Sequence, residues 1–420
     1  MKLSIIALYV ICSYFLLTAI AGLGNMLGIG ILLKLDLILL LSGLYIFFSS
    51  SVKKMEGIEV FHNIFRSFFL LCISLSSAFN NYSTDLFYYG LRYQILLTIF
   101  FFVGKSEWFA DWKFFDKMQM PIIAVSLIGL YLYLAQPSWY IAWKLQSTTE
   151  FSSESRILEM TRLSAFWQYP YWVSYGCALL YHYKLYTMFT SNVKKQDVLV
   201  IFFLFFIIVL TQQRAPLLFI VLSTVFFYIY SFCTKSKYQY KKFRRILNIS
   251  IIALVMGTLY VLLNVLDEDR ILFMINKIIS ADSGNTSFLS ERLGLYKDFQ
   301  SMPVTFWGDG IGRYSHLAYQ QNKLAITDCQ YIQTLHETGY FGLIGYILLF
   351  IYLIVNGMRN IKLNIFEIGV LIFYLIAMIG ANPLSNQGIH TIFLWICCGR
   401  IINNDCLHYK QNEYEKSNCN

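Results

Sequence analysis

The chain has 420 residues, of which 57% are hydrophobic and only 14% are charged. A soluble globular domain carries roughly a quarter charged residues, so this composition argues against a water-soluble protein. The net charge of +9 is compatible with nucleic-acid binding, but the basic residues crowd into short linkers between apolar runs. We therefore exclude nucleic acid as a partner.

Apolar runs recur along the chain, and a helical run of about 20 residues covers the hydrocarbon core of a bilayer. The strands of a membrane barrel would instead alternate apolar and polar residues. The sequence therefore predicts an all-α, polytopic membrane protein with about twelve transmembrane helices. The predicted spans are 3–24, 28–50, 64–79, 86–104, 120–137, 166–186, 197–212, 214–233, 246–266, 337–356, 365–380 and 388–402.

The linkers between spans fix the orientation, because short basic loops stay on the cytoplasmic side of the membrane. The densest basic linker is 235–245, and this rule places both termini in the cytoplasm. The longest predicted outer loop is partly helical and contains more acidic than basic residues. The predicted organisation is 1–266 for spans one to nine with a shorter outer loop at 138–165, 267–336 for the large outer loop, 337–402 for spans ten to twelve, and 403–420 for a cytoplasmic tail.

Ionisable residues inside spans mark functional sites, or else they reach the interface or pair with each other. Arg92 lies near the outer end of the fourth span, and Arg214 lies in a tight outward turn between spans seven and eight. Lys34 and Asp36 in the second span are placed to pair. Arginines at the outer surface, where topology does not favour positive charge, indicate an anionic ligand, and guanidinium binds phosphate through paired hydrogen bonds.

The large outer loop contains a predicted amphipathic helix at 289–299, with Arg292 beside Tyr296. A plain helix lying on the membrane surface explains the same pattern. A glycine-rich turn that ends at Arg313 follows, and it matches neither a nucleotide-binding loop nor a dinucleotide fingerprint.

The end of the large loop runs directly into the tenth span. Asp328 shares a helical face with apolar residues there, over the outer mouth of the bundle, or it caps the helix. His336 has no second histidine at metal-binding spacing, so we expect no metal site. In the shorter loop, Arg162 precedes an aromatic stretch at 166–172, which either forms part of the aromatic belt of the membrane or stacks on sugar rings.

These features together resemble the O-antigen polymerase and ligase superfamily, which includes the Wzy-type polysaccharide polymerases. The resemblance covers the architecture and an ordered set of motifs. The ligases carry His followed by Asn where this chain has Asp328 and Cys329, so the polymerase branch is the better match. The motif residues are Arg162 before the aromatic stretch, Arg214 at the outer turn, Arg292 in the loop helix, Gly308, Gly310 and Gly312 in the turn, and Asp328 with Gly339 and Gly342 downstream.

The resemblance implies a glycosyltransferase of the bacterial cytoplasmic (inner) membrane that needs no metal or cofactor. It would polymerise polyisoprenyl-diphosphate-linked oligosaccharide repeat units into O-antigen or capsule at the outer leaflet. A flippase and a chain-length regulator are the partner proteins that the family implies.

The residue roles follow from the resemblance and from the charge that the reaction develops. The expected catalytic residues are Arg214, Arg292 and Asp328, of which Asp328 orients or deprotonates the acceptor hydroxyl. The arginines would neutralise the leaving diphosphate. The expected diphosphate-binding residues are Arg214, Arg292, Arg162 and Arg92, and the expected sugar or acceptor contacts are Tyr296, Arg313 and His336.

Two alternatives stay open from the sequence, beside a residual one in which the protein is a structural scaffold. A transporter of lipid-linked oligosaccharide would depend on span residues such as Lys34 and Asp36 rather than on the large loop. A ligase would transfer glycan to a lipid or protein acceptor.

Overall fold

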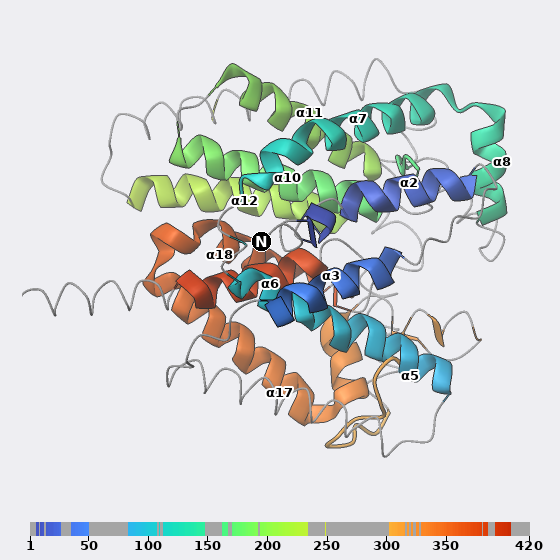
Figure 1. Ribbon diagram of the computed structural model, residues 1–420, viewed down its shortest axis with the longest axis vertical. Coiled ribbons are helices and arrows are strands. Elements are labelled where there is room, and N and C mark those ends of the chain that lie inside the picture. Colours follow the sequence, from blue (N-terminus) through green and yellow to red (C-terminus); the bar gives the residue numbers. More distant parts are fainter. Residues whose placement is uncertain are drawn as a thin grey trace, which may run out of the picture. The chain divides into compact units, whose positions relative to one another are not determined.

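The computed structural model is all-helical in the part of the chain that it describes, with no strand there (Figure 1). Helices lie at each predicted span that these residues cover, and the span at 64–79 and most of the span at 246–266 lie outside them. The described residues are 6–7, 9–11, 14–26, 35–49, 83–106, 109, 112–147, 162–166, 170–191, 194–233, 248, 302–315, 317–318, 321, 325–326, 329–379, 381–384 and 391–404.

The chain divides into two compact units, and the boundary falls within helix α7. Unit 1 comprises Met1–Ala124 and Val304–Asn420, and unit 2 comprises Val125–Pro303. The helices are α2 (Tyr14–Met26), α3 (Leu35–Ser49), α5 (Thr84–Gly90), α6 (Phe100–Lys105), α7 (Phe114–Ala135), α8 (Ser138–Ser147), α10 (Tyr171–Thr190), α11 (Lys195–Thr211), α12 (Arg214–Cys233), α17 (Gln330–Arg359) and α18 (Ile361–Ala377), with a further helical stretch at 391–404.

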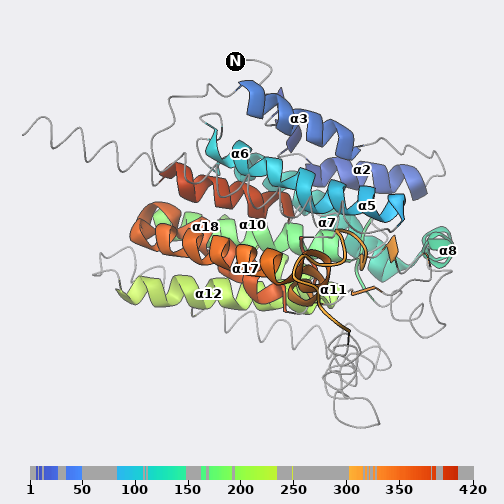
Figure 2. The same ribbon diagram turned by 90° about the horizontal axis from the view of Figure 1, so that it is seen from below.

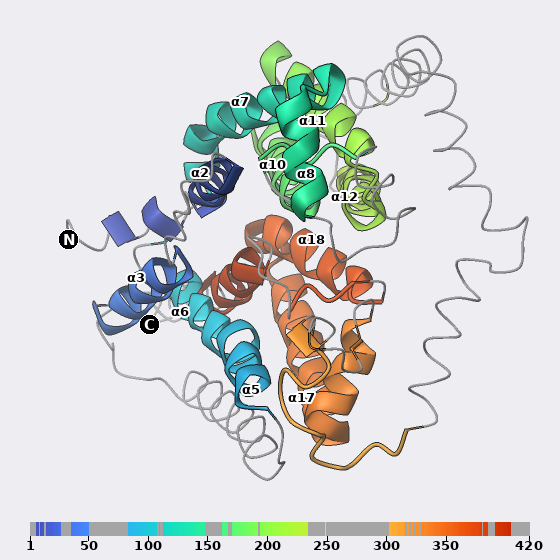
Figure 3. The ribbon, with the colours of Figure 1, turned by 90° about the vertical axis from the view of Figure 1, so that its right-hand side faces the viewer.

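Unit 1 is built around α17 and α18, which pack against each other and are joined by the single residue Asn360 (Figure 2). The fourth predicted span is not one regular helix. Its chain runs from α5 through the π-helical η1 (Leu91–Ile95) and the 3-10 helix η2 (Leu96–Ile99) into α6, along one line (Figure 3). Such π-helical insertions often occur at functional sites.

Helix α17 begins at Gln330, seven residues before the start predicted for the tenth span, so the end of the predicted outer loop is helical. The buried residues of these added turns are mostly polar, and they pack against residues 309–314 and against residues 378–384 at the end of α18. The helix is interrupted at Gly339, where φ is 71° and ψ is −174°. Only glycine adopts this backbone conformation without a large steric cost.

Unit 2 contains α10 packed against both α11 and α12 (Figure 3). Pro170 precedes the first residue of α10, where a missing N–H costs nothing because the first turn has no intrahelical acceptor. The predicted shorter outer loop begins with a helix that the apolar pattern did not predict, α8. Its aromatic and polar composition is too mixed to stand out as an apolar run.

Two helices among the described residues are long and apolar enough to cross a membrane, Phe114–Ala135 and Gln330–Arg359. Shorter apolar helices lie at Leu96–Lys105 and Ala215–Ser231.

Candidate functional site

The predicted site residues fall into three groups in the structure. Arg92, Arg313 and His336 lie in unit 1, and Arg162 and Arg214 lie in unit 2. Arg292, Tyr296 and Asp328 lie outside the described residues, as does Lys34.

In unit 2, Arg162 and Arg214 belong to one loop cluster, formed by residues 136–144, 162–166 and 211–214. The Leu163 N–H donates to the Leu210 carbonyl at 3.1 Å, which docks the Arg162 segment on the last turn of α11. Arg214 begins α12 only four residues after Leu210. The structure thus brings together two arginines that are 52 positions apart in the chain.

The loop cluster contains a third basic residue that the sequence reasoning missed, Lys144 of α8. Its side chain is buried at 4% exposure, its ammonium donates to the Arg162 carbonyl at 3.0 Å, and it lies over the Tyr140 ring. Tyr140 donates to the Ala165 carbonyl at 3.2 Å. Burial raises the pKa of Tyr140 to about 12, against a smaller lowering by its hydrogen bond with Ser164, so the phenol stays a donor at physiological pH.

Backbone strain is concentrated in the same loop cluster. Within the described ranges, the non-glycine residues with positive φ are Gln136 (43°), Ala165 (52°) and Gln212 (53°), and all three lie here. A left-handed conformation costs a non-glycine residue roughly 1–2 kcal/mol. Strain of this kind gathers at functional sites because the surrounding structure is selected to hold it.

In unit 1, the glycine turn (residues 307–313) lies against the first turns of α17. The Asp309 N–H donates to the His336 carbonyl at 2.8 Å, and the Gly310 N–H donates to the Glu337 carbonyl at 3.0 Å. Gly308 and Gly339 both have positive φ, and a Cβ on either would collide with backbone of the other segment. The predicted glycine motif therefore works by close approach of two backbones.

The opposite side of the glycine turn lies against the end of α5. A Cβ built on Gly90 would be 2.6 Å from the Gly312 nitrogen, so only glycine fits at this crossing. Arg92, two residues further on in η1, has an exposed side chain. Contact between Gly90 and Gly312 thus places Arg92 and Arg313 in the same region of unit 1.

The centre of this region is Glu337, a fully buried carboxylate that the sequence reasoning did not single out. It accepts hydrogen bonds from the side-chain amides of Gln94 and Gln333 and from the Tyr314 and Gly312 N–H groups. The four donors come from η1, from α17, and from the glycine turn together with Tyr314, the residue that follows it. Glu337 therefore ties three segments of unit 1 together.

Asp309 of the glycine turn and Tyr314, the residue that follows the turn, form a second polar pair. The buried Tyr314 phenol donates to Asp309 Oδ2 at 2.6 Å, and Asp309 itself is half-buried. Burial, followed by the hydrogen bond and the charge of Asp309, raises the pKa of Tyr314, so the phenol remains protonated at physiological pH. His336 is buried with its ring edge-on to Tyr314, 5.6 Å between centroids.

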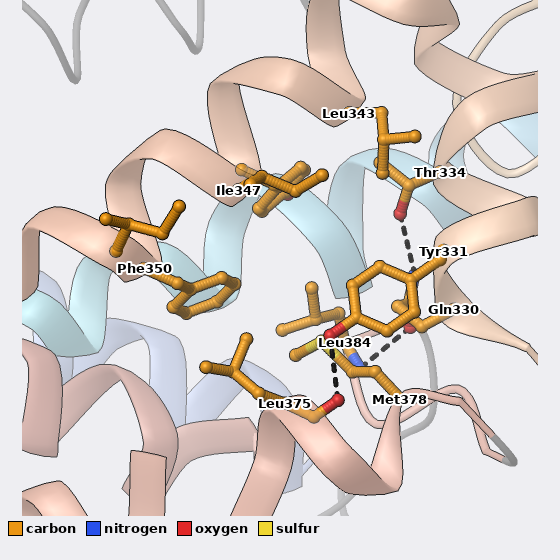
Figure 4. A pocket seen from close by; sticks show the side chains of 11 residues that line it. Gln330, Tyr331, Thr334, Leu343, Ile347, Phe350, Leu375, Met378 and Leu384 are labelled. Carbon is orange, nitrogen blue, oxygen red and sulfur yellow. Dashed lines mark hydrogen bonds between the residues drawn. The ribbon is translucent and has the colours of Figure 1, made fainter. Parts of the chain in front are cut away.

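A cavity of about 210 Å³ lies between α17 and α18 (Figure 4). Figure 4 shows Gln330, Tyr331 and Thr334 at one end, with their polar groups engaged in hydrogen bonds, and apolar side chains such as Leu343 and Phe350 along the rest. Ligand pockets usually enclose about 300–1,000 Å³. This cavity is too small and too apolar to be the site of sugar chemistry.

Metal binding finds no support in the described residues, where no cluster of three or more His, Cys, Asp or Glu side chains could hold an ion. No protein-family model matches the chain, and no curated protein matches it. The candidate site therefore rests on its own geometry and on the motifs read from the sequence.

Proposed function

We propose that this chain is a multi-pass glycosyltransferase of the bacterial inner membrane, with about twelve spans and both termini in the cytoplasm. It polymerises polyisoprenyl-diphosphate-linked oligosaccharide repeat units into a surface polysaccharide. A flippase would supply the repeat units, and a chain-length regulator would act with the enzyme.

The observation that carries this proposal is the docking of the Arg162 segment beside the turn that ends at Arg214. Arg162, Lys144 and Arg214 are three basic residues that belong to one loop cluster of unit 2. The cluster also includes the N-terminus of α12, a 20-residue helix whose first N–H groups favour an anion. A diphosphate is an anion of the right chemistry for such a place.

The reaction needs charge neutralisation more than protonation, since a diphosphate leaves as a stable anion. The acceptor hydroxyl oxygen forms the new bond to the anomeric carbon, while the bond from that carbon to the diphosphate breaks and its electron pair leaves with the diphosphate. The hydroxyl proton passes to Asp328 and from there to water. Preorganised cations aimed at the leaving group provide the main stabilisation of the transition state.

The exposed face of α17 supports the membrane part of the proposal. Its exposed apolar side chains recur at helical spacing, whereas Tyr346, Phe350 and Leu353 face the protein interior. An apolar stripe of this length is unfavourable in water and favourable in lipid. The exposed residues are Tyr340, Ile344, Ile347, Leu348, Ile351, Val355 and Met358.

The packing within unit 1 also agrees with spans that alternate in direction. The start of α17 bonds to the end of α18, through the Gln330 N–H and the Met378 carbonyl at 3.0 Å. At the other end of unit 1, Asn404 donates to Asn364 at 2.7 Å and Arg400 donates to the Phe109 carbonyl at 2.8 Å. Predicted outer ends meet outer ends, and predicted cytoplasmic ends meet cytoplasmic ends.

The test is deletion of the gene in its host, with surface polysaccharide resolved on a gel and plasmids supplying variants. We expect the deletion to leave single repeat units and wild type to restore the ladder. Arg214→Ala, Arg162→Ala and Arg292→Ala should each slow polymerisation by about 10²–10³-fold, as loss of one transition-state donor does. Lys144→Met should slow polymerisation less than the arginine variants do. It removes the hydrogen bond that holds the Arg162 carbonyl but leaves the Arg162 side chain in the protein.

The matched control is Arg359→Ala, which removes an exposed arginine at the far end of α17. It should restore a full ladder at equal expression. A ladder that survives deletion would reject the polymerase and favour a transporter. Lipid-linked polymer that accumulates without attachment would favour the ligase.

A further inference from the structure

A rigid part of unit 1 presents the Asp309 carboxylate, which takes no part in the proposed charge neutralisation or proton transfer. The glycine turn is fixed by main-chain hydrogen bonds to α17, by the close approach of Gly90, and by the buried Glu337. Sites held on such rigid supports keep the geometry that binding and catalysis need.

The Asp309 carboxylate has one oxygen engaged and one available. Oδ2 accepts the Tyr314 phenol at 2.6 Å, and the Asp309 side chain makes no other hydrogen bond within the described ranges. The Tyr314 phenol stays protonated and buried, so it holds the carboxylate in a fixed orientation. A fixed acceptor oxygen at a half-buried position is suited to receive a hydrogen bond from a ligand hydroxyl.

Arg313 lies beside this carboxylate. Its guanidinium donates to the Asp309 main-chain carbonyl at 3.3 Å, and no ion pair joins the two side chains within 4.0 Å. The carboxylate therefore keeps acceptor capacity for a ligand, and the guanidinium supplies donors close by. A carboxylate and a guanidinium on one turn provide the acceptors and donors that neighbouring sugar hydroxyls require.

We propose that Asp309, held by Tyr314 and accompanied by Arg313, forms a subsite that binds and orients the hydroxyls of the acceptor sugar. The inference rests on the proposed polymerase function and adds a substrate-binding carboxylate to Asp328. Asp309 acts by accepting a hydrogen bond, and no proton or other group is transferred to it.

The competing explanation is a purely structural role for Asp309, in which its hydrogen bond with Tyr314 only stabilises the glycine turn. The variant Asp309→Asn separates the two roles. Its amide oxygen still accepts the Tyr314 phenol, so the turn is retained, but the charged acceptor for a ligand hydroxyl is lost. Tyr314→Phe removes the orienting bond and leaves the charge.

The experiment uses the full chain in lipid nanodiscs, with lipid-linked repeat units purified from the host as donor. The acceptor is the same oligosaccharide released from its lipid by mild acid. We expect Asp309→Asn to lower kcat/KM for this acceptor by about 10- to 100-fold, the loss of a hydrogen bond to a charged group, chiefly by raising its KM. Donor binding and the thermal unfolding midpoint should stay at wild-type values.

Tyr314→Phe should produce a smaller increase in the same KM. The control Asp85→Asn removes an exposed carboxylate in the first turn of α5 and should change nothing. Wild-type acceptor kinetics in Asp309→Asn would overturn the subsite while leaving the polymerase intact. A lowered unfolding midpoint with parallel loss of donor binding would overturn it in favour of the structural role. A wild-type protein that forms no polymer would instead reject the proposed function.

Discussion

Glu337 is the residue on which the local order of unit 1 most depends. Its carboxylate is fully buried and receives donors from three segments. One of the donors, the Gln333 side chain, also accepts a hydrogen bond from the Asn382 side chain at 2.6 Å. The network therefore continues to the segment that follows α18. Buried polar networks of this kind stabilise a structure only when every member finds its partner.

Glu337→Gln tests this network with almost no change in volume. The amide offers one acceptor oxygen in place of two and directs its own N–H groups toward the existing donors. A buried donor left without a partner costs about 1–3 kcal/mol, so we expect the thermal unfolding midpoint of the purified protein to fall by several degrees. Asp85→Asn serves as the reference, and an unchanged midpoint would show that the carboxylate is not the centre of the network.

At the scale of elements, the two glycine motifs form one crossing of the glycine turn with α17. Gly308 and Gly339 lie opposite each other and both need positive φ. The break in α17 at Gly339 frees backbone groups for the turn, and the Phe341 N–H donates to the Phe306 carbonyl at 3.4 Å. The helix can therefore leave the polar region and continue as an apolar rod.

Gly339→Ala is expected to disrupt this crossing. The new methyl group would collide with the Phe306 carbonyl oxygen, and the backbone would occupy a region reserved for glycine. We expect a lower unfolding midpoint and faster proteolysis near the glycine turn, both measured on protein in nanodiscs. In Gly43→Ala of α3, the methyl group would meet only side-chain atoms, with Ile99 at 3.1 Å, and that variant should keep its midpoint. Equal behaviour of the two variants would contradict the close-approach argument.

At the scale of the whole molecule, the proposed topology assigns each end of α17 to a different side of the membrane. Exposed side chains are available at Trp307, which packs against Phe341 just after the break in α17, at Leu348 in the middle of the helix, and at Met358 near its end. Because lipid excludes a charged reagent, these three positions should respond differently to a membrane-impermeant maleimide.

Cysteine substitutions at these positions provide the measurement, with wild type as the background. In intact spheroplasts, Trp307→Cys should react, Met358→Cys should react only after permeabilisation, and Leu348→Cys should stay unreacted in both. Reaction of Met358→Cys before permeabilisation would reverse the proposed orientation. Reaction of Leu348→Cys in both states would argue against a lipid-facing α17.

The sequence by itself determined the helical class and the approximate position of each described helix except α8, because long apolar runs and their polar interruptions are local properties. It also located the Arg214 turn and the glycine turn, where a short polar or glycine-rich stretch breaks the pattern. The early start of α17 escaped it, since a polar helical turn gains its stability from the segment packed over it.

Only the tertiary structure decided which polar residues meet. Gln94 and Glu337 are 243 positions apart, and the Lys144 ammonium finds its acceptor on a different segment. Nothing in the chain near Glu337 or Lys144 indicates these partners, because a buried hydrogen bond depends on which segments become neighbours. The strained backbone at Gln136, Ala165 and Gln212 has the same origin, since packing from outside the residue must hold it there.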